Sequence, residues 1–229
     1  MKKRLAVLLM MALLCAGNAQ AVCFQPENAT EGKLQALACL MDCAFSAEYG
    51  EANTKLLRWQ EPIRIYVCGA PTKEDLCQLD AFIMELSFRV PLLPKVERVE
   101  NAEAANITMY FVPRDDMGKY VSNYVTGNDG FVTYFYENSI ITRAEIAVAC
   151  DKTVQAERNG ILREELVNGL GLGNDHYRYE DSIIYEPYNI IQTLSEVDWL
   201  MLNMVYSPYT KPGMTANEAY LALYREIMK

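Results

Sequence analysis

The chain has 229 residues, of which 51% are hydrophobic and 22% charged, with 12 Gly and 9 Pro. This composition excludes a disordered or collagen-like chain and allows one compact domain with a sizeable core. The 21 basic and 30 acidic residues give a net charge of −9, and an acidic chain repels phosphate backbones and anionic lipid. We therefore expect neither a nucleic acid nor a membrane surface as its partner.

Residues 1–21 have the pattern of a secretory signal peptide. A basic Lys-Lys-Arg start at 2–4 is followed by an apolar run over about 5–15 and by the small-residue site Ala-Gln-Ala at 19–21. The apolar run is too short to span a bilayer, and no later stretch reaches about 18 apolar residues. We expect cleavage after Ala21 and a periplasmic or secreted protein. Loss of the three basic residues would leave a net charge of −12.

The cysteines outside the signal peptide predict disulfides. They are Cys23, Cys39, Cys43, Cys68, Cys77 and Cys150. An even number of cysteines in an oxidising compartment predicts up to three disulfides, with the connectivity left open. The one local pairing that we predict joins Cys68, at a strand end, to Cys77 in the next helix. A zinc site is disfavoured because there is no C-x-x-C pair and no histidine near the cysteines.

Hydrophobic periodicity and capping patterns predict the other elements in chain order. A helix over residues 34–47 lies in an N-terminal helical segment, 22–60, before the main domain, 61–229. In that domain we expect strands over 63–67, 107–112, 131–136 and 140–150, and helices from 72, from about 154 to 170, from 195 and from 215. With no repeat and no long linker, these elements predict one α+β domain with a mixed sheet.

The most informative segment is Arg163-Glu-Glu-Leu-Val-Asn-Gly-Leu-Gly-Leu-Gly-Asn174. It resembles the active-site helix of the metzincin zinc peptidases, particularly the matrixins, whose pattern is H-E-x-x-H-x-x-G-x-x-H. By this resemblance, Glu164, Asn168 and Asn174 occupy the three metal-ligand positions. Glu165 occupies the general-base position, and Gly171 the position of the glycine that turns the chain.

Two later segments extend the resemblance in the same order. Residues 181–185 are similar to the matrixin Met-turn, with Ile184 where the methionine would stand, and residues 194–206 resemble the closing helix of that family. Together with residues 211–215, they also resemble a family of secreted proteobacterial proteins known only as a domain of unknown function, over most of the chain from about Pro62. The resemblance implies a single zincin/metzincin-like domain with an active-site-type helix and C-terminal helices.

The departures from the metzincin pattern decide the expected chemistry. All three histidine ligands are missing, and a neutral Asn amide is a poor ligand for zinc. Without a tightly held zinc ion, no bound water is activated near neutral pH, so Glu165 would have no activated water to deprotonate as general base. We therefore expect no zinc and no other cofactor, and a protease scaffold without zinc-peptidase activity.

Other chemistries at this segment are weaker. Calcium would need about six to eight oxygen ligands, and only Glu164, Asn174 and Asp175 suggest themselves. His176, the only histidine, could turn inward as a substitute ligand, although an ordinary loop histidine is the favoured interpretation. Its proximity to Ser182 is at chance level for a catalytic triad. The Gly-rich stretch 169–173 follows a helix, which favours a helix end and a turn with positive φ over a phosphate-binding loop.

The sequence thus favours a binding module for a peptide or an envelope protein. An extended peptide would add to strand 140–149 beside the active-site-type helix. The expected binding residues are Glu164, Asn168, Asn174, Asp175, His176 and Tyr185, with Tyr134, Tyr136 and Tyr177 as further cleft aromatics. Two alternatives stay open. One is an atypical metal-dependent hydrolase that uses Glu165 as general base, and the other is a purely structural envelope protein.

Overall fold

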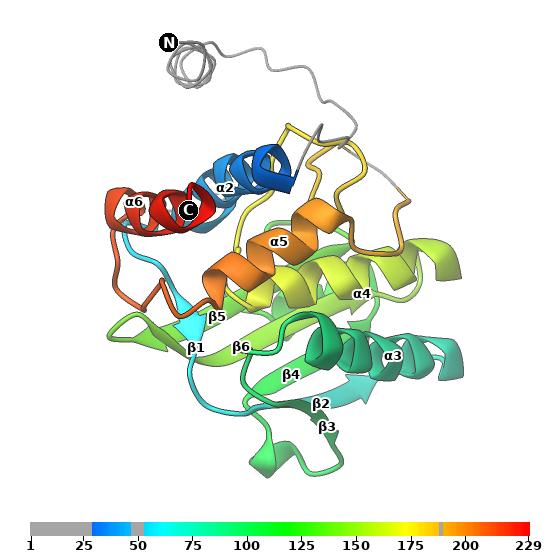
Figure 1. Ribbon diagram of the computed structural model, residues 1–229. Helices are drawn as coiled ribbons and strands as arrows, with labels where there is room; N and C mark the ends of the chain where they lie inside the picture. Colours follow the sequence, from blue (N-terminus) through cyan, green and yellow to red (C-terminus); the bar gives the residue numbers. More distant parts are fainter. Residues whose placement is uncertain (1–28, 47–52, 188–189) are drawn as a thin grey trace.

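The computed structural model describes residues 29–46, 53–187 and 190–229 (Figure 1). The predicted signal peptide and Cys23 lie outside these residues. The strands are β1 (Arg58–Trp59), β2 (Ile63–Gly69), β3 (Val96–Val99), β4 (Ile107–Val112), β5 (Gly130–Glu137) and β6 (Ile140–Ala149). The α-helices are α2 (Ala29–Phe45), α3 (Lys73–Arg89), α4 (Gln155–Gly169), α5 (Glu196–Val205) and α6 (Ala216–Ile227), and two short 3-10 helices are η1 (Ala102–Ala104) and η2 (Arg114–Lys119).

The helices and the single described sheet confirm the predicted α+β class, and the sheet is mostly parallel. Strands β3, β2, β4 and β6 lie side by side and parallel, and the short β1 pairs in parallel with the start of β6. Strand β5 pairs with β6 in antiparallel orientation. It is joined to β6 by Asn138 and Ser139, whose φ angles of 50° and 65° suit a two-residue hairpin turn.

This hairpin corrects one prediction about the site. Strand β6, which covers the predicted peptide-binding strand 140–149, pairs with β4 on one side and with β5 on the other. An interior strand offers no backbone edge to a peptide. Among the described strands, β5 instead lies at the edge of the sheet next to α4, because the tight turn folds it back along the outside of β6.

Local sequence signals place most helix starts. The side chains of Thr72, Ser195 and Thr215 each accept a hydrogen bond from the backbone N–H of the residue three positions later. The acidic side chain of that later residue accepts the backbone N–H of the capping residue in return. The three predicted capping boxes are thus confirmed. Strands β1 and β3 were not predicted, because two and four residues are too few for alternation to stand out.

The helices form layers on one side of the sheet (Figure 1). Helix α4 contacts β5 and β6, α3 contacts β3 and α4, and α2 packs against α5 and α6. The main core combines strand side chains such as Ile65 and Ile146 with Phe82 of α3 and Leu166 of α4. On the opposite face, a smaller cluster under η2 includes Met117. No helix in the described part of the chain has the length and apolar character that a membrane span requires.

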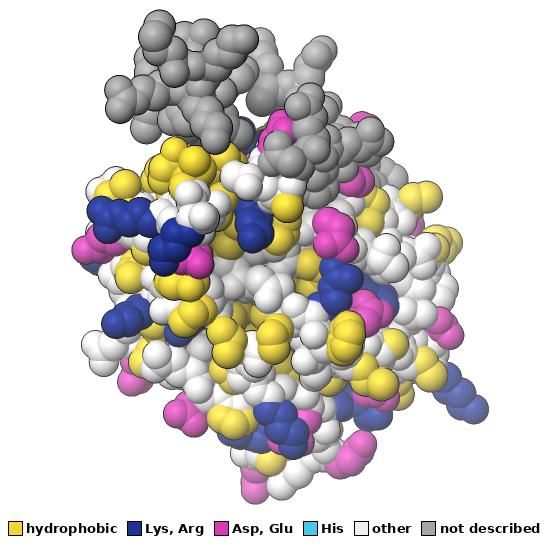
Figure 2. Space-filling model, viewed as in Figure 1, with side chains coloured by type: hydrophobic (Ala, Val, Ile, Leu, Met, Phe, Trp, Pro, Cys, Tyr) yellow, Lys and Arg dark blue, Asp and Glu magenta, His cyan; other side chains and the backbone are white. Residues whose placement is uncertain are grey.

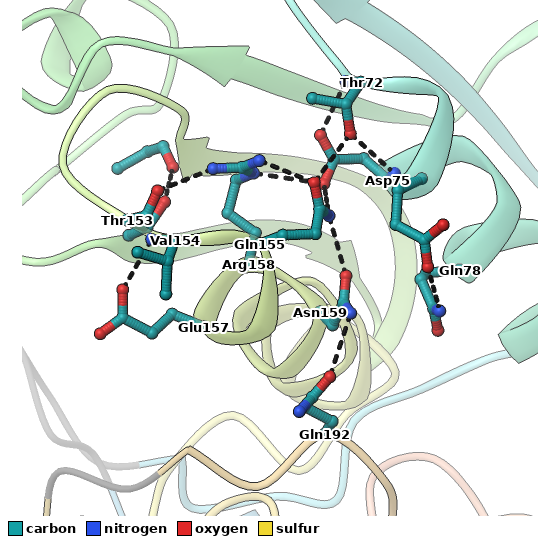
Figure 3. A network of polar contacts seen from close by, with 12 residues as sticks. Thr72, Asp75, Gln78, Thr153, Val154, Gln155, Glu157, Arg158, Asn159 and Gln192 are labelled. Carbon is teal, nitrogen blue, oxygen red and sulfur yellow. Dashed lines mark hydrogen bonds and ion pairs between the residues drawn. The ribbon is translucent and has the colours of Figure 1, made fainter.

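A polar network fixes the start of α4 against α3 (Figure 3). The Asp75 carboxylate is 1% exposed, accepts hydrogen bonds from the Thr72 backbone and from Gln155, and pairs with Arg158. Burial acts to raise the pKa of Asp75, but these hydrogen bonds outweigh it and leave the pKa lowered. Through Gln155 the network reaches Asn159, whose amide donates to Gln192. Helix α4 is therefore held both to α3 and to the segment around residue 191.

The predicted disulfides are corrected by the structure. The cysteines within the described residues are all free thiols. Cys68 is the register partner of Tyr110, which packs on the face under η2, whereas α3 covers the other face. Cys77 lies on the exposed side of α3. The two thiols of the predicted Cys68–Cys77 pair therefore point away from each other.

Candidate functional site

An open cleft of about 1110 Å³ lies between the edge strand β5 and helix α4. One wall is formed by β5 from Gly130 to Tyr134, and the other by side chains of α4. Residues 173, 175 and 185–187 close one part of the cleft, and residues 123–129 another. The cleft therefore runs beside the backbone of an edge strand.

Helical spacing explains which α4 side chains face this cleft. Residues 157, 160, 161, 164, 165 and 168 line it, and they recur every three to four residues on one face of the helix. Glu165 is 8% exposed and packs against the backbone of β5. A Cβ atom at Gly130 would lie 2.4 Å from Glu165 Oε1, so the absence of a side chain at Gly130 leaves room for this carboxylate.

The glycines after α4 turn the chain back toward the cleft. Gly171 has a φ of 114° and Gly173 a φ of 68°, as predicted for a helix end followed by a turn. A Cβ atom at Gly171 would lie 2.5 Å from the carbonyl oxygen of Leu57, and one at Gly173 would lie 2.4 Å from the Tyr134 hydroxyl. After this turn the chain continues through Asn174 to Asp175, which lines the cleft.

The structure brings together five of the residues proposed from the sequence. Glu164, Glu165, Asn168, Asp175 and Tyr185 all line the cleft. Asn168 is 8% exposed, and its amide nitrogen lies 3.5 Å from Asp175 Oδ1. The side-chain amide oxygen of Asn168, Oδ1, is buried and has no hydrogen-bond partner among the described residues.

Two other proposed residues are not part of the cleft lining. Asn174 donates hydrogen bonds to Ser46 Oγ, at 2.6 Å, and to the Asp42 carbonyl oxygen, so its amide faces the end of α2. His176 is 1% exposed and is enclosed by the loop that it begins. Of the predicted cleft aromatics, Tyr134 lines the cleft with Tyr185, whereas Tyr136 and Tyr177 are more than half exposed and lie outside its lining.

His176 belongs to a buried network that the sequence did not reveal. Its Nε2 lies 3.1 Å from Ser182 Oγ, and the Ser182 hydroxyl donates to Asp198 Oδ1 at 2.5 Å. Because Nδ1 accepts the backbone N–H of Arg178 at 3.1 Å, the imidazole proton resides on Nε2. Ser182 thus donates to the aspartate and accepts from the histidine, the reverse of a serine activated by a histidine base.

Burial controls the ionisation of this network. Burial, aided by the nearby Arg178 charge, lowers the pKa of His176 to about 4. Burial raises the pKa of Asp198, although hydrogen bonds from Ser182, Ser195 and the Ile183 backbone oppose this shift. The three side chains are at most 1% exposed. The network therefore ties loop 176–184 to α5 and has no access to a substrate.

The three predicted metal-ligand residues do not all line the cleft. Of the three ligand positions implied by the metzincin resemblance, Glu164 and Asn168 line the cleft and Asn174 does not. Within residues 29–46, 53–187 and 190–229, no group of three or more His, Cys, Asp or Glu side chains is placed to hold a metal ion together.

The fold and site define an α+β protein whose mostly parallel sheet ends in an antiparallel edge strand beside an open, carboxylate-rich cleft. A comparison with family models places residues 35–225 in the family described as protein of unknown function (DUF2927), and the chain belongs to this family. The predicted membership of a domain family of unknown function is thereby confirmed, and the match begins well before Pro62. No curated protein matches the sequence.

Proposed function

We propose that this domain is a zincin/metzincin-like scaffold without a zinc site, and that it binds an extended peptide by adding it as a strand to β5. The observation that carries the proposal is the position of the cleft along the edge strand of the sheet. An edge strand supplies backbone hydrogen bonds to an extended peptide, and pockets beside it select alternate side chains.

The arrangement around the cleft supports the metzincin-like part of the proposal. The sheet is mixed, and the helix with the Glu164–Glu165 pair lies directly against its antiparallel edge strand. The chain leaves that helix through Gly171 at positive φ and returns to the cleft at Asp175. Both features agree with what the resemblance implies for an active-site helix followed by a glycine turn.

The residues at the ligand positions do not fit zinc. The Asn174 amide is committed to Ser46 and to the end of α2, and the His176 ring is committed to Ser182 and Arg178. Of the ligand-position residues, only Glu164 and Asn168 line the cleft, and a carboxylate and an amide without an imidazole are a poor donor set for a transition metal. We accordingly propose a non-catalytic role.

Strand addition is tested best by changing the peptide and leaving the protein intact. Random-sequence octapeptide pools would first supply a peptide that binds the purified protein, measured by fluorescence anisotropy. Two isomers of it are then made, each N-methylated at every second amide. In an added strand alternate N–H groups face the sheet edge, so we expect one isomer to bind about tenfold or more weakly and the other to bind nearly as well as the parent.

Two results would contradict strand addition. Equal loss in both isomers would indicate that the backbone edge is not what β5 recognises. Absence of binding by every pool would remove the peptide-binding role and favour a purely structural envelope protein.

The second candidate, an atypical metal-dependent hydrolase, is favoured by one observation. Glu165 lines the cleft together with Glu164, and the metzincin resemblance gives Glu165 the position of the general base. It predicts cleavage of bound peptides, an activity that depends on added metal, and loss of this activity in Glu165→Gln. Intact peptides after long incubation with several divalent metals would rule against it, and we expect that result.

We also propose that the protein acts outside the cytoplasm, in the periplasm or as a secreted protein, with an envelope protein or peptide as its partner. The support is the signal-peptide pattern of residues 1–21. Mass spectrometry of the protein recovered from its host should find an N-terminus at Val22. An intact Met1 on protein taken from the cytoplasm would contradict export.

A further inference from the structure

The charge of the cleft lining is one-sided. Among the described residues that line it, none is Lys, Arg or His. Six carry carboxylates, namely Asp129, Glu157, Glu164, Glu165, Asp175 and Glu186. This imbalance is not a property of the whole surface, because the face seen in Figure 2 carries basic and acidic side chains interspersed.

Some of these charges have partners that belong to the fold. Asp129 forms an ion pair with Arg114, which lies outside the cleft lining. Glu157 accepts the backbone N–H of Val154 at the start of α4. The other carboxylates of the lining belong to Glu164 and Glu165 of α4 and to Asp175 and Glu186 in the chain that follows it.

A second, independent observation concerns hydrogen-bond acceptors. Two buried oxygen atoms in residues that line the cleft, Asn168 Oδ1 and Glu186 Oε2, have no hydrogen-bond partner among the described residues. The Asn168 side chain is more than nine-tenths buried, and a buried acceptor left without a donor is unfavourable. Both atoms are acceptors, so a ligand that brings hydrogen-bond donors would satisfy them.

We infer that the cleft selects basic side chains, with Arg or Lys residues at alternate positions of the extended peptide. This inference rests on the proposed strand addition to β5. Successive side chains of an added strand point to opposite faces, so every second residue faces α4. A guanidinium or ammonium group carries donors for these acceptors and also the positive charge that is absent from the described lining.

Peptides that differ only in charge test the inference. Three octapeptides carry Arg, citrulline or Glu at every second position, and citrulline keeps the shape of arginine without its charge. We expect the Arg peptide to bind the purified protein about tenfold or more tightly than the citrulline peptide, and the Glu peptide to bind most weakly. The Arg preference should shrink as salt rises from low to physiological concentration.

Matched variants locate the effect in the cleft. Glu164→Gln and Asp175→Asn each remove one charge from the lining, and each should reduce the Arg-over-citrulline preference about two- to fivefold. Glu61→Gln removes one charge from an exposed residue outside the lining and should leave the preference unchanged. Equal reduction by Glu61→Gln would overturn the inference, because the preference would then reflect net charge alone.

The experiment separates failure of this inference from failure of the proposed function. If the Arg and citrulline peptides bind equally well, charge selection is overturned and strand addition stands. If no peptide binds but N-acetyl-arginine amide perturbs the spectra of α4 residues, cation recognition stands and strand addition is overturned. If neither the peptides nor the arginine amide binds, both are overturned.

Discussion

The burial of His176 predicts how the free energy of unfolding depends on pH. Because His176 is the only histidine in the chain, its titration can be followed by itself. Its ring accepts a hydrogen bond from the Arg178 backbone and donates one to Ser182, so the fold holds the neutral form. Burial lowers its pKa from 6.5 to about 4 in the folded protein. As pH falls below 6.5, the His176 imidazole becomes protonated in the unfolded chain. In the folded protein it stays neutral until about pH 4.

The sign and size of the effect follow from this difference. Because the unfolded state binds more protons between pH 6.5 and 4, the free energy of unfolding falls as pH falls through this window. The full shift is worth about 3 kcal/mol, of which about 2 kcal/mol is lost by pH 5. The raised pKa of Asp198 acts in the opposite direction, since folding then favours its protonated form.

Two assays isolate the histidine. The single imidazole resonance in a proton NMR titration should stay in its neutral position down to about pH 5. Urea unfolding at pH 7.5 and pH 5 should show a larger loss of stability in the wild type than in His176→Gln, which keeps Asp198 and its partners. A resonance that titrates near pH 6.5, or equal losses in both proteins, would refute the structural placement of His176.

Three further predictions concern stability and thiol chemistry. Ser182→Ala removes the partner of His176 Nε2 and of Asp198 Oδ1, both buried, and should lower the free energy of unfolding by about 2 kcal/mol in urea titrations. A change below about 0.5 kcal/mol would contradict the network. Gly173→Ala should cost about 1–2 kcal/mol beyond the control Gly127→Ala, because both have positive φ but only the former Cβ would clash, with Tyr134. In the native protein, iodoacetamide should modify the exposed Cys77 readily and the two buried α2 cysteines, whose pKa values burial raises, only after unfolding. A protein mass that indicates a disulfide among Cys39, Cys43, Cys68, Cys77 and Cys150 would contradict this thiol reactivity.

The fold elements that could be predicted are those with local signals. Capping boxes fixed the starts of three helices, and alternation located β2, β4, β5 and β6. Much of the site was also predictable, because residues 164, 165 and 168 share one helix face and Gly171 ends that face in a turn. The spacing within one helix therefore predicted what lines one wall of the cleft.

What the sequence did not predict depends on contacts between distant residues. Asn174 turns toward Ser46, and Ser182 meets Asp198, across separations that no local pattern encodes. The Cys68 prediction could have been corrected from the sequence, because Cys68 is out of phase with the buried Ile63 and Ile65 on its strand. An odd spacing from them places the thiol on the face of the sheet opposite α3.

The most direct test of the central claim is amide hydrogen exchange with and without a bound peptide. If the peptide adds to the edge of the sheet beside α4, amides within β5 should exchange more slowly in the complex, whereas those of β3, the strand at the far edge, should be unchanged. Protection confined to β3, or to the outer helices α2 and α6, would contradict peptide binding in the cleft.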